Sequence, residues 1–128
     1  AVFVNGDKVV FDSVKGYALV KVRDCDKVTV SMPMKVERKI LNGKAEYERG
    51  PIVLARDERF GEDLGLPVAV PKKEGGAVAK LVKNTDFYTN ETIKIKTRNG
   101  EITLCDYSSA GKNYDSENCN MSVWQNID

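Results

Sequence analysis

Four carboxylates crowd the segment that follows the most apolar run of the chain. They are Asp57, Glu58, Glu62 and Asp63. Paired carboxylates can exchange protons with a sugar or bind calcium through their oxygens. Their spacing does not match a calcium-binding loop, and Arg56 and Arg59 balance two of the four charges. The pattern therefore favours ordinary solvated charges, and no catalytic role is predicted for them.

The chain contains no histidine, so the commonest general base and the commonest metal ligand are both missing. Its three cysteines, Cys25, Cys105 and Cys119, lack the short paired spacing of a structural zinc site. Cys105 and Cys119 lie at the ends of two predicted strands, where a disulfide is one alternative. Three reduced thiols are the other alternative, which the odd count favours. The sequence predicts no metal and no cofactor.

Aromatic residues give a better indication of binding. In the last apolar segment Met121 and Val123 should share one face of a strand, which places Trp124 with Ser122 on the other face. If the first pair lines the core, Trp124 points outward. An outward tryptophan can stack on a sugar ring, pack against another domain or cover a sheet edge. The last two roles are favoured here.

Length and charge restrict the class of protein. A chain of 128 residues suits one domain with a sizeable core. Twenty basic and nineteen acidic residues indicate no nucleic-acid partner, and no apolar stretch approaches membrane-spanning length. The sequence opens on Ala1-Val2-Phe3-Val4, inside a predicted strand, so we expect it to be part of a longer polypeptide.

The elements that would position these residues are strands, because apolar residues recur with a period of two and no segment sustains a helical period. Turns at Asn5-Gly6, Asn42-Gly43 and Asn99-Gly100 predict hairpins. The run Ile52–Ala55 predicts a central strand, because it is apolar on both sides of the pleat. We predict an all-β fold, a two-sheet antiparallel β-sandwich of jelly-roll type with about ten short strands.

Two tyrosines, Tyr17 after Gly16 and Tyr107 after Asp106, are expected in the core with only the hydroxyl exposed. Between Arg56 and Lys83, glycine, proline and acidic residues interrupt every apolar run, so a long irregular segment is expected there.

Several short motifs occur in an order that resembles the C-terminal β-sandwich region of bacterial β-L-arabinofuranosidase-like glycoside hydrolases. They are Gly16-Tyr17, Asp26-Lys27-Val28, Met32-Pro33-Met34, Arg49-Gly50-Pro51-Ile52-Val53-Leu54, Asp106-Tyr107-Ser108-Ser109-Ala110-Gly111-Lys112 and Ser122-Val123-Trp124. The resemblance covers nearly the whole chain. The segment Val22–Asp26 is shorter than its counterpart in that family and has neither its Trp nor its Gly.

The resemblance implies that the chemistry of the parent protein lies elsewhere. Members of that family look like a helical (α/α) barrel flanked by β-sandwiches, with a cysteine nucleophile, acidic residues and a zinc ion in the barrel. Residues 1–128 would be one non-catalytic accessory domain from the C-terminal part of such a hydrolase. Its partner would be the helical-barrel catalytic domain, which it braces.

The residues expected at a domain interface or in contact with a sugar are Trp124, Arg49 and Glu48. The alternative function is a carbohydrate-binding module that holds a plant-type oligosaccharide, and it would need two or more exposed aromatic residues on one face.

Overall fold

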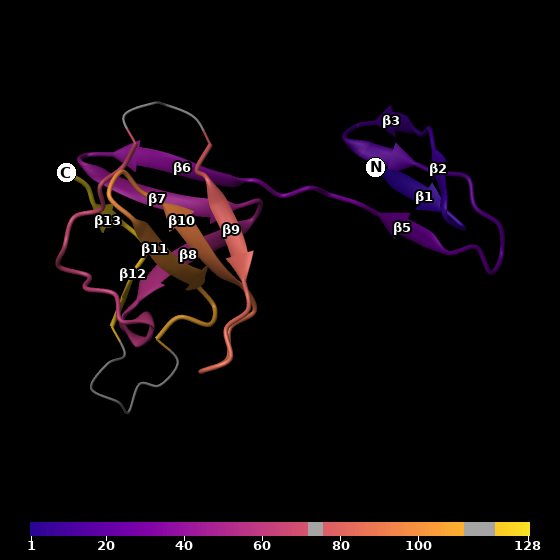
Figure 1. Cartoon of the computed structure of the whole chain (residues 1–128). Coiled ribbons are helices and arrows are strands. Elements are labelled where there is room, and N and C mark those ends of the chain that lie inside the picture. The colour runs from indigo at the N-terminus through magenta and orange to yellow at the C-terminus, as the bar shows by residue number, and fades with distance from the viewer. Residues whose placement is uncertain (72–75, 112–119) are drawn as a thin grey trace. The chain divides into compact units, whose positions relative to one another are not determined.

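The computed structural model of the protein describes residues 1–71, 76–111 and 120–128 (Figure 1). They form two compact units, unit one from Ala1 to Pro33 and unit two from Met34 to Asp128. The composition suits one domain, whereas the structure divides the chain at Pro33. This residue has no N–H to donate to a ladder, and it lies in a stretch where no strand is formed. Among the described residues, no helix is long and apolar enough to cross a membrane.

Unit one consists of short antiparallel strands. They are β1 (Val2–Val4), β2 (Asp7–Val9), β3 (Asp12–Val14), β4 (Tyr17–Leu19) and β5 (Val28–Val30). The first sheet has the order β2-β1-β5, and β3 pairs with β4 in a separate hairpin. Asn5 and Gly6 both have positive φ, 53° and 93°, which is typical of the type I′ turn expected from Asn-Gly. The predicted first hairpin is therefore confirmed.

The three-stranded sheet of unit one has one face made of valines. Val2 lies opposite both Val9 and Val30, and Val4 lies opposite Val28. Residues directly opposite each other in a ladder share a face, so all five side chains lie together. Val2 is buried, but Val30 is 55% exposed. The valine face is thus uncovered along β5, where Val28 and Val30 are exposed.

Unit two is built around one sheet of eight strands. They are β6 (Val36–Leu41), β7 (Lys44–Arg49), β8 (Ile52–Asp57), β9 (Ala79–Val82), β10 (Thr92–Lys96), β11 (Glu101–Asp106), β12 (Met121–Ser122) and β13 (Gln125–Asn126), with a short 3₁₀ helix η1 (Glu58–Phe60) after β8. The order is β13-β7-β8-β11-β10-β9, with β6 on β7 and β12 on β8. Figure 1 shows this sheet curling. Two of its edge strands are β6, which pairs with β7 alone, and β9, which pairs with β10 alone.

The concave side of the curled sheet holds the apolar core. Its buried members come from strands far apart in the sequence: Val36, Ala45, Tyr47, Leu54, Val68, Ile93, Ile95, Ile102 and Leu104. The alternation that predicts strands also predicts this core, because Ile93 and Ile95 are buried while Lys94 and Lys96 are exposed. The all-β, antiparallel fold is confirmed, and so is the central position of β8 between β7 and β11.

Three local predictions are wrong. The final segment forms two short strands, β12 and β13, instead of one, because the Ser122 hydroxyl donates to the Trp124 carbonyl in a turn between them. Tyr17 and Tyr107 are 75% and 53% exposed, so neither is a core residue. Tyr17 is the first residue of β4, directly after the Lys15-Gly16 turn, and Tyr107 begins the turn that follows β11.

Candidate functional site

Asp57 is the most buried member of the acidic cluster. It ends β8 and caps η1, and its carboxylate accepts bonds from the Arg59 backbone N–H at 2.9 Å, the Arg59 guanidinium at 2.6 Å and the Gly111 N–H at 2.9 Å. Burial alone would raise its pKa, but these donors outweigh burial and hold the pKa below its usual value. Asp57 is therefore a buried, ionised carboxylate, and the expectation of a solvated charge is wrong for it.

Glu62 has a comparable role at the start of the long irregular segment. Its carboxylate pairs with the Arg56 guanidinium at 2.8 Å and accepts the Thr103 N–H at 2.7 Å, while Arg56 also donates to the Leu66 carbonyl at 2.9 Å. The loop is thereby fixed to β8 and β11. Of the four acidic residues, Asp63 alone is exposed. The described part of the chain has no group of three or more Cys, Asp or Glu placed to hold a metal.

Asp106 organises a second polar cluster at the end of β11. Its Oδ1 accepts the backbone N–H groups of Asn90 and Glu91, and its Oδ2 accepts the Asn90 amide and the hydroxyls of Ser108 and Ser109, all within 3.0 Å. Burial would raise its pKa, but the hydrogen bonds lower it strongly. The Asp-Tyr-Ser-Ser motif therefore fixes the chain near residues 90 and 91 to the end of β11.

The two clusters are continuous. The Arg59 guanidinium that pairs with Asp57 also donates to the Ser109 carbonyl at 2.8 Å, and the Ser109 hydroxyl donates to Asp106. Arg59 lies 4.1 Å from the ring centre of Phe87, which packs against Phe60. With so many donors bound to each carboxylate, the network stabilises ionised, fixed groups rather than a proton-exchanging pair.

Glu48 and Arg49 are neighbours on β7, so their side chains lie on opposite faces of the sheet. Glu48 pairs with Lys39 at 2.6 Å on the outer face, and Arg49 pairs with Glu91 at 2.5 Å. The Arg49 and Glu91 side chains are mostly buried, and Glu91 Oε2 has no hydrogen-bond partner within the described ranges. The sequence does not suggest Glu91 as a partner, because 42 positions separate it from Arg49.

Glu46 and Glu48 lie two residues apart on the same face of β7 and affect each other. Burial, followed by the nearby Glu48 charge, raises the pKa of Glu46. The hydrogen bond from Lys39 lowers the pKa of Glu48. The two carboxylates thus take up protons at different pH values, with Glu46 protonated first as the pH falls.

Trp124 is 38% exposed, while Met121 and Val123 pack against a small core of Ala55, Cys105 and Ala110. The predicted alternation is therefore correct at these positions. Trp124 directly precedes β13, which pairs with Lys44 and Ala45 at the start of β7, whereas Glu48 and Arg49 lie at the end of that strand. A role of these three residues at an interface or in contact with a sugar stays a prediction.

The cysteines are placed as two independent thiols. Cys25 is exposed, and Cys105 is buried and free. Burial and then the nearby charges of Asp57 and Asp106 raise the pKa of the Cys105 thiol to about 12. This thiol remains protonated near neutral pH and is a poor nucleophile. Cys119, its partner in the alternative that forms a disulfide, lies outside the described residues.

No family model, curated protein or solved structure matches this chain.

Proposed function

We propose that this chain is a non-catalytic β-sandwich domain of a larger glycoside hydrolase of the β-L-arabinofuranosidase-like type, and that it braces the helical-barrel catalytic domain. The proposal combines the order of the sequence motifs with one structural observation. That observation is the uncovered apolar surface of unit one.

Unit one buries only one large apolar side chain, Val2, and exposes nine. They are Val10, Phe11, Val14, Tyr17, Leu19, Val22, Val28, Val30 and Met32. Soluble proteins rarely leave so much apolar surface to water unless a partner covers it. A unit of 33 residues also buries too little surface to be stable by itself. A bracing domain needs such a surface, since it must pack against the domain it supports.

The polar clusters of unit two support a structural role. Among the acidic residues that the structure describes, Asp57 and Asp106 are the most buried, and both are already bound by several donors. A general acid needs a carboxyl group that can hold and release a proton at the working pH. The lowered pKa values of Asp57 and Asp106 are opposite to that need. They suit groups that fix loops in place.

In this proposal Trp124 adds a second contact with the catalytic domain, because a large, partly exposed indole is well suited to an interface. Glu48 pairs with Lys39 on the outer face of β7, and Arg49 pairs with Glu91 at the end of the same strand. They would contribute to the interface through shape and charge, without a catalytic role.

The competing function, a carbohydrate-binding module, can be separated by titration. The chain is titrated with arabinan and arabinose oligosaccharides while the fluorescence of Trp124, the single tryptophan, is followed. The proposal expects no saturable change and no release of sugar by the chain alone. A saturable change that disappears in Trp124→Ala would support the binding module and overturn the bracing role.

A further inference from the structure

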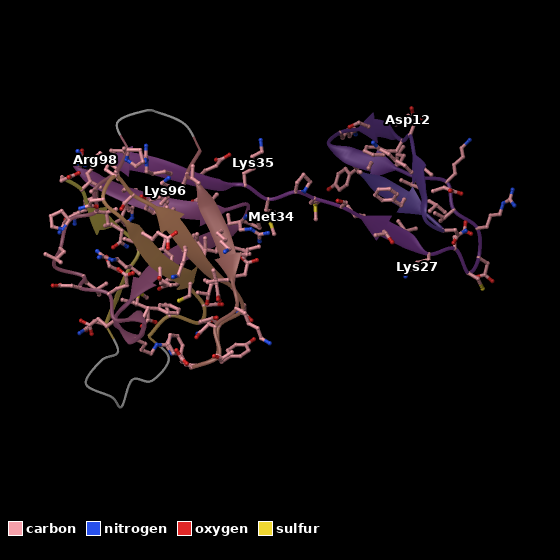
Figure 2. The ribbon with its side chains drawn as sticks, in the orientation of Figure 1. Asp12, Lys27, Met34, Lys35, Lys96 and Arg98 are labelled. Atoms are coloured by element: carbon pink, nitrogen blue, oxygen red, sulfur yellow. The ribbon has the colours of Figure 1, made fainter. Side chains whose placement is uncertain are left out.

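The curled sheet of unit two does not close, and it leaves an open seam between its end strands. We define the seam as the space between residues 34–38, at the start of β6, and residues 76–81, which lead into β9. A cavity of ≈ 350 Å³ lies there, lined by Met34, Lys35, Val36, Arg49, Gly76, Ala77, Ala79, Leu81 and Ile93. A second cavity of ≈ 430 Å³ continues along residues 35–38. Figure 2 labels Met34 and Lys35 just before β6.

The interior of the seam reaches the apolar core. Val36 and Ile93 belong to the core cluster and also line the first cavity. Leu81 lies opposite Ile93 in the ladder and shares its inward face, yet it is 54% exposed. A leucine on the core side of an end strand is exposed because no neighbouring strand covers it. The seam thus has space for apolar side chains.

The outer edge of β9 presents backbone groups that no other strand of the described residues pairs with. The Lys96 N–H donates to the Val78 carbonyl, so Val78 and Lys96 form a hydrogen-bonded pair. In an antiparallel ladder such pairs alternate, which makes Lys80 and Lys94 the next bonded pair. The backbone N–H and C=O groups of the intervening residues, Ala79 and Leu81, therefore point away from β10. They are available to an added strand.

The outward face of the same edge is basic. Lys80 lies directly opposite Lys94, and Lys96 follows on the same face. Like charges that face each other across a ladder are unfavourable. Lys94 has a long contact with Glu101, 3.8 Å, whereas Lys80 forms no ion pair with any residue that the structure describes. An acidic residue on an added strand would relieve this repulsion.

We propose that the seam binds an extended segment of another polypeptide by strand addition to β9, and that this segment alternates apolar and acidic residues. The apolar side chains enter the cavity beside Leu81, Val36 and Ile93. The acidic side chains lie on the outer face beside Lys80. The backbone of the segment pairs with Ala79 and Leu81. This proposal concerns unit two and does not depend on the proposed function.

The charges favour such a partner over a second copy of the chain. Antiparallel pairing of two β9 strands about their centre would place Lys80 opposite Lys80, and lysine on an edge strand opposes such self-association. Lys35 adds further positive charge at the cavity, whereas Arg49 is already paired with Glu91. An acidic strand complements Lys35 and Lys80.

The test uses the full chain, labelled with ¹⁵N, and a blocked seven-residue peptide that alternates glutamate and valine. Saturable shifts are expected at the amides of Ala79 and Leu81, together with slower hydrogen exchange at both. Two control peptides test the charge and the alternation separately. The first replaces each glutamate with lysine. The second has the same composition, but its glutamates and its valines are grouped in two separate runs. We expect both controls to bind at least tenfold more weakly.

Two variants test the geometry. Ala79→Pro removes an outward N–H without removing a bond to β10, and we expect at least a tenfold loss of binding. Lys80→Glu should weaken binding of the glutamate peptide about five- to tenfold and improve binding of the lysine peptide. The second variant keeps the backbone intact, so it decides the matter if Ala79→Pro does not fold.

Three results would overturn the proposal. The first is equal binding of all three peptides, and the second is unchanged binding by both variants. The third is a set of shifts confined to residues away from 76–82. Concentration-dependent self-association without peptide binding would indicate a second copy as the occupant. Binding of a small carboxylate alone, with no added exchange protection at Ala79, would indicate a small-molecule site.

Discussion

At the scale of single residues, the buried acids of unit two stabilise the fold. Asp57 and Asp106 each bind several N–H or O–H donors, and Ser109 connects the two clusters. A buried carboxylate is tolerated only where donors replace its lost water. Removing its charge should therefore cost far more stability than removing an exposed charge nearby.

Asp57→Asn should lower the free energy of unfolding by about 3 kcal/mol, because it leaves the Arg59 guanidinium without its anionic partner. Asp63→Asn is the matched control, since Asp63 belongs to the same loop but is exposed. We expect the control to change stability by no more than about 0.5 kcal/mol. Urea unfolding of both variants measures the difference. Equal effects would show that the Asp57 pair contributes nothing beyond a surface charge.

Acid should destabilise the protein partly through Asp106. Its pKa in the folded state lies below the value of about 3.9 expected when unfolded, so the unfolded state binds the proton more readily. The stability that Asp106 provides is complete above about pH 4 and is lost as the pH falls toward the folded pKa. The free energy of unfolding should therefore fall less steeply below pH 4 in Asp106→Asn than in the natural protein. Identical slopes would contradict this account.

At the scale of elements, the hairpin turns are the features best predicted from sequence. Asn5-Gly6 and Asn42-Gly43 both have positive φ at two successive residues, as a two-residue hairpin requires. Such turns depend on the conformations allowed to the residues within them. The Lys15-Gly16 turn has the same geometry, with φ of 51° and 83°, but lysine gives no comparable signal. It was therefore not predicted.

Gly50 is a turn residue with a second constraint. Its φ is +58°, and a Cβ there would lie 2.7 Å from Met34 Sδ, whereas Gly43, with φ +72°, has no atom within 4 Å. Gly43→Ala should cost about 1 kcal/mol from backbone strain alone. Gly50→Ala should cost more, because Met34 must also move. Thermal unfolding measures the cost of each substitution. The additional cost of Gly50→Ala should disappear in a protein that also carries Met34→Ala. An equal cost for both glycines would rule out the Met34 contact.

The distant contacts could not be predicted from sequence. The Arg49–Glu91 pair spans 42 positions, and the bond from Arg59 to the Ser109 carbonyl spans 50. Periodicity identifies strands and the face each buries, but it contains no information about which strands become neighbours. The open seam between β6 and β9 follows from that strand order, so it too was not predicted. The exposure of Trp124 was predicted, because the alternation of apolar and polar residues within one short segment is enough to tell which side chains point outward.

At the scale of the whole molecule, the two units differ in how well they cover their apolar residues. Unit two contains the whole main core cluster, whereas unit one buries only Val2 among its large apolar residues. We expect residues 34–128 alone to unfold cooperatively with a β-type circular dichroism spectrum. Residues 1–33 alone should be unfolded, since so short a chain cannot bury enough surface. A folded monomeric 1–33 peptide would contradict the view that unit one needs a covering partner.

The central claim is that this chain braces a helical-barrel catalytic domain. The direct measurement is to sequence the gene in full and to coexpress this chain with any helical-barrel segment that the gene encodes, followed by size-exclusion chromatography with light scattering. The account predicts a stable one-to-one complex in which the amides of Val28 and Val30 gain hydrogen-exchange protection. A full gene that encodes no helical barrel, or a barrel that elutes separately and leaves these amides unprotected, would contradict it.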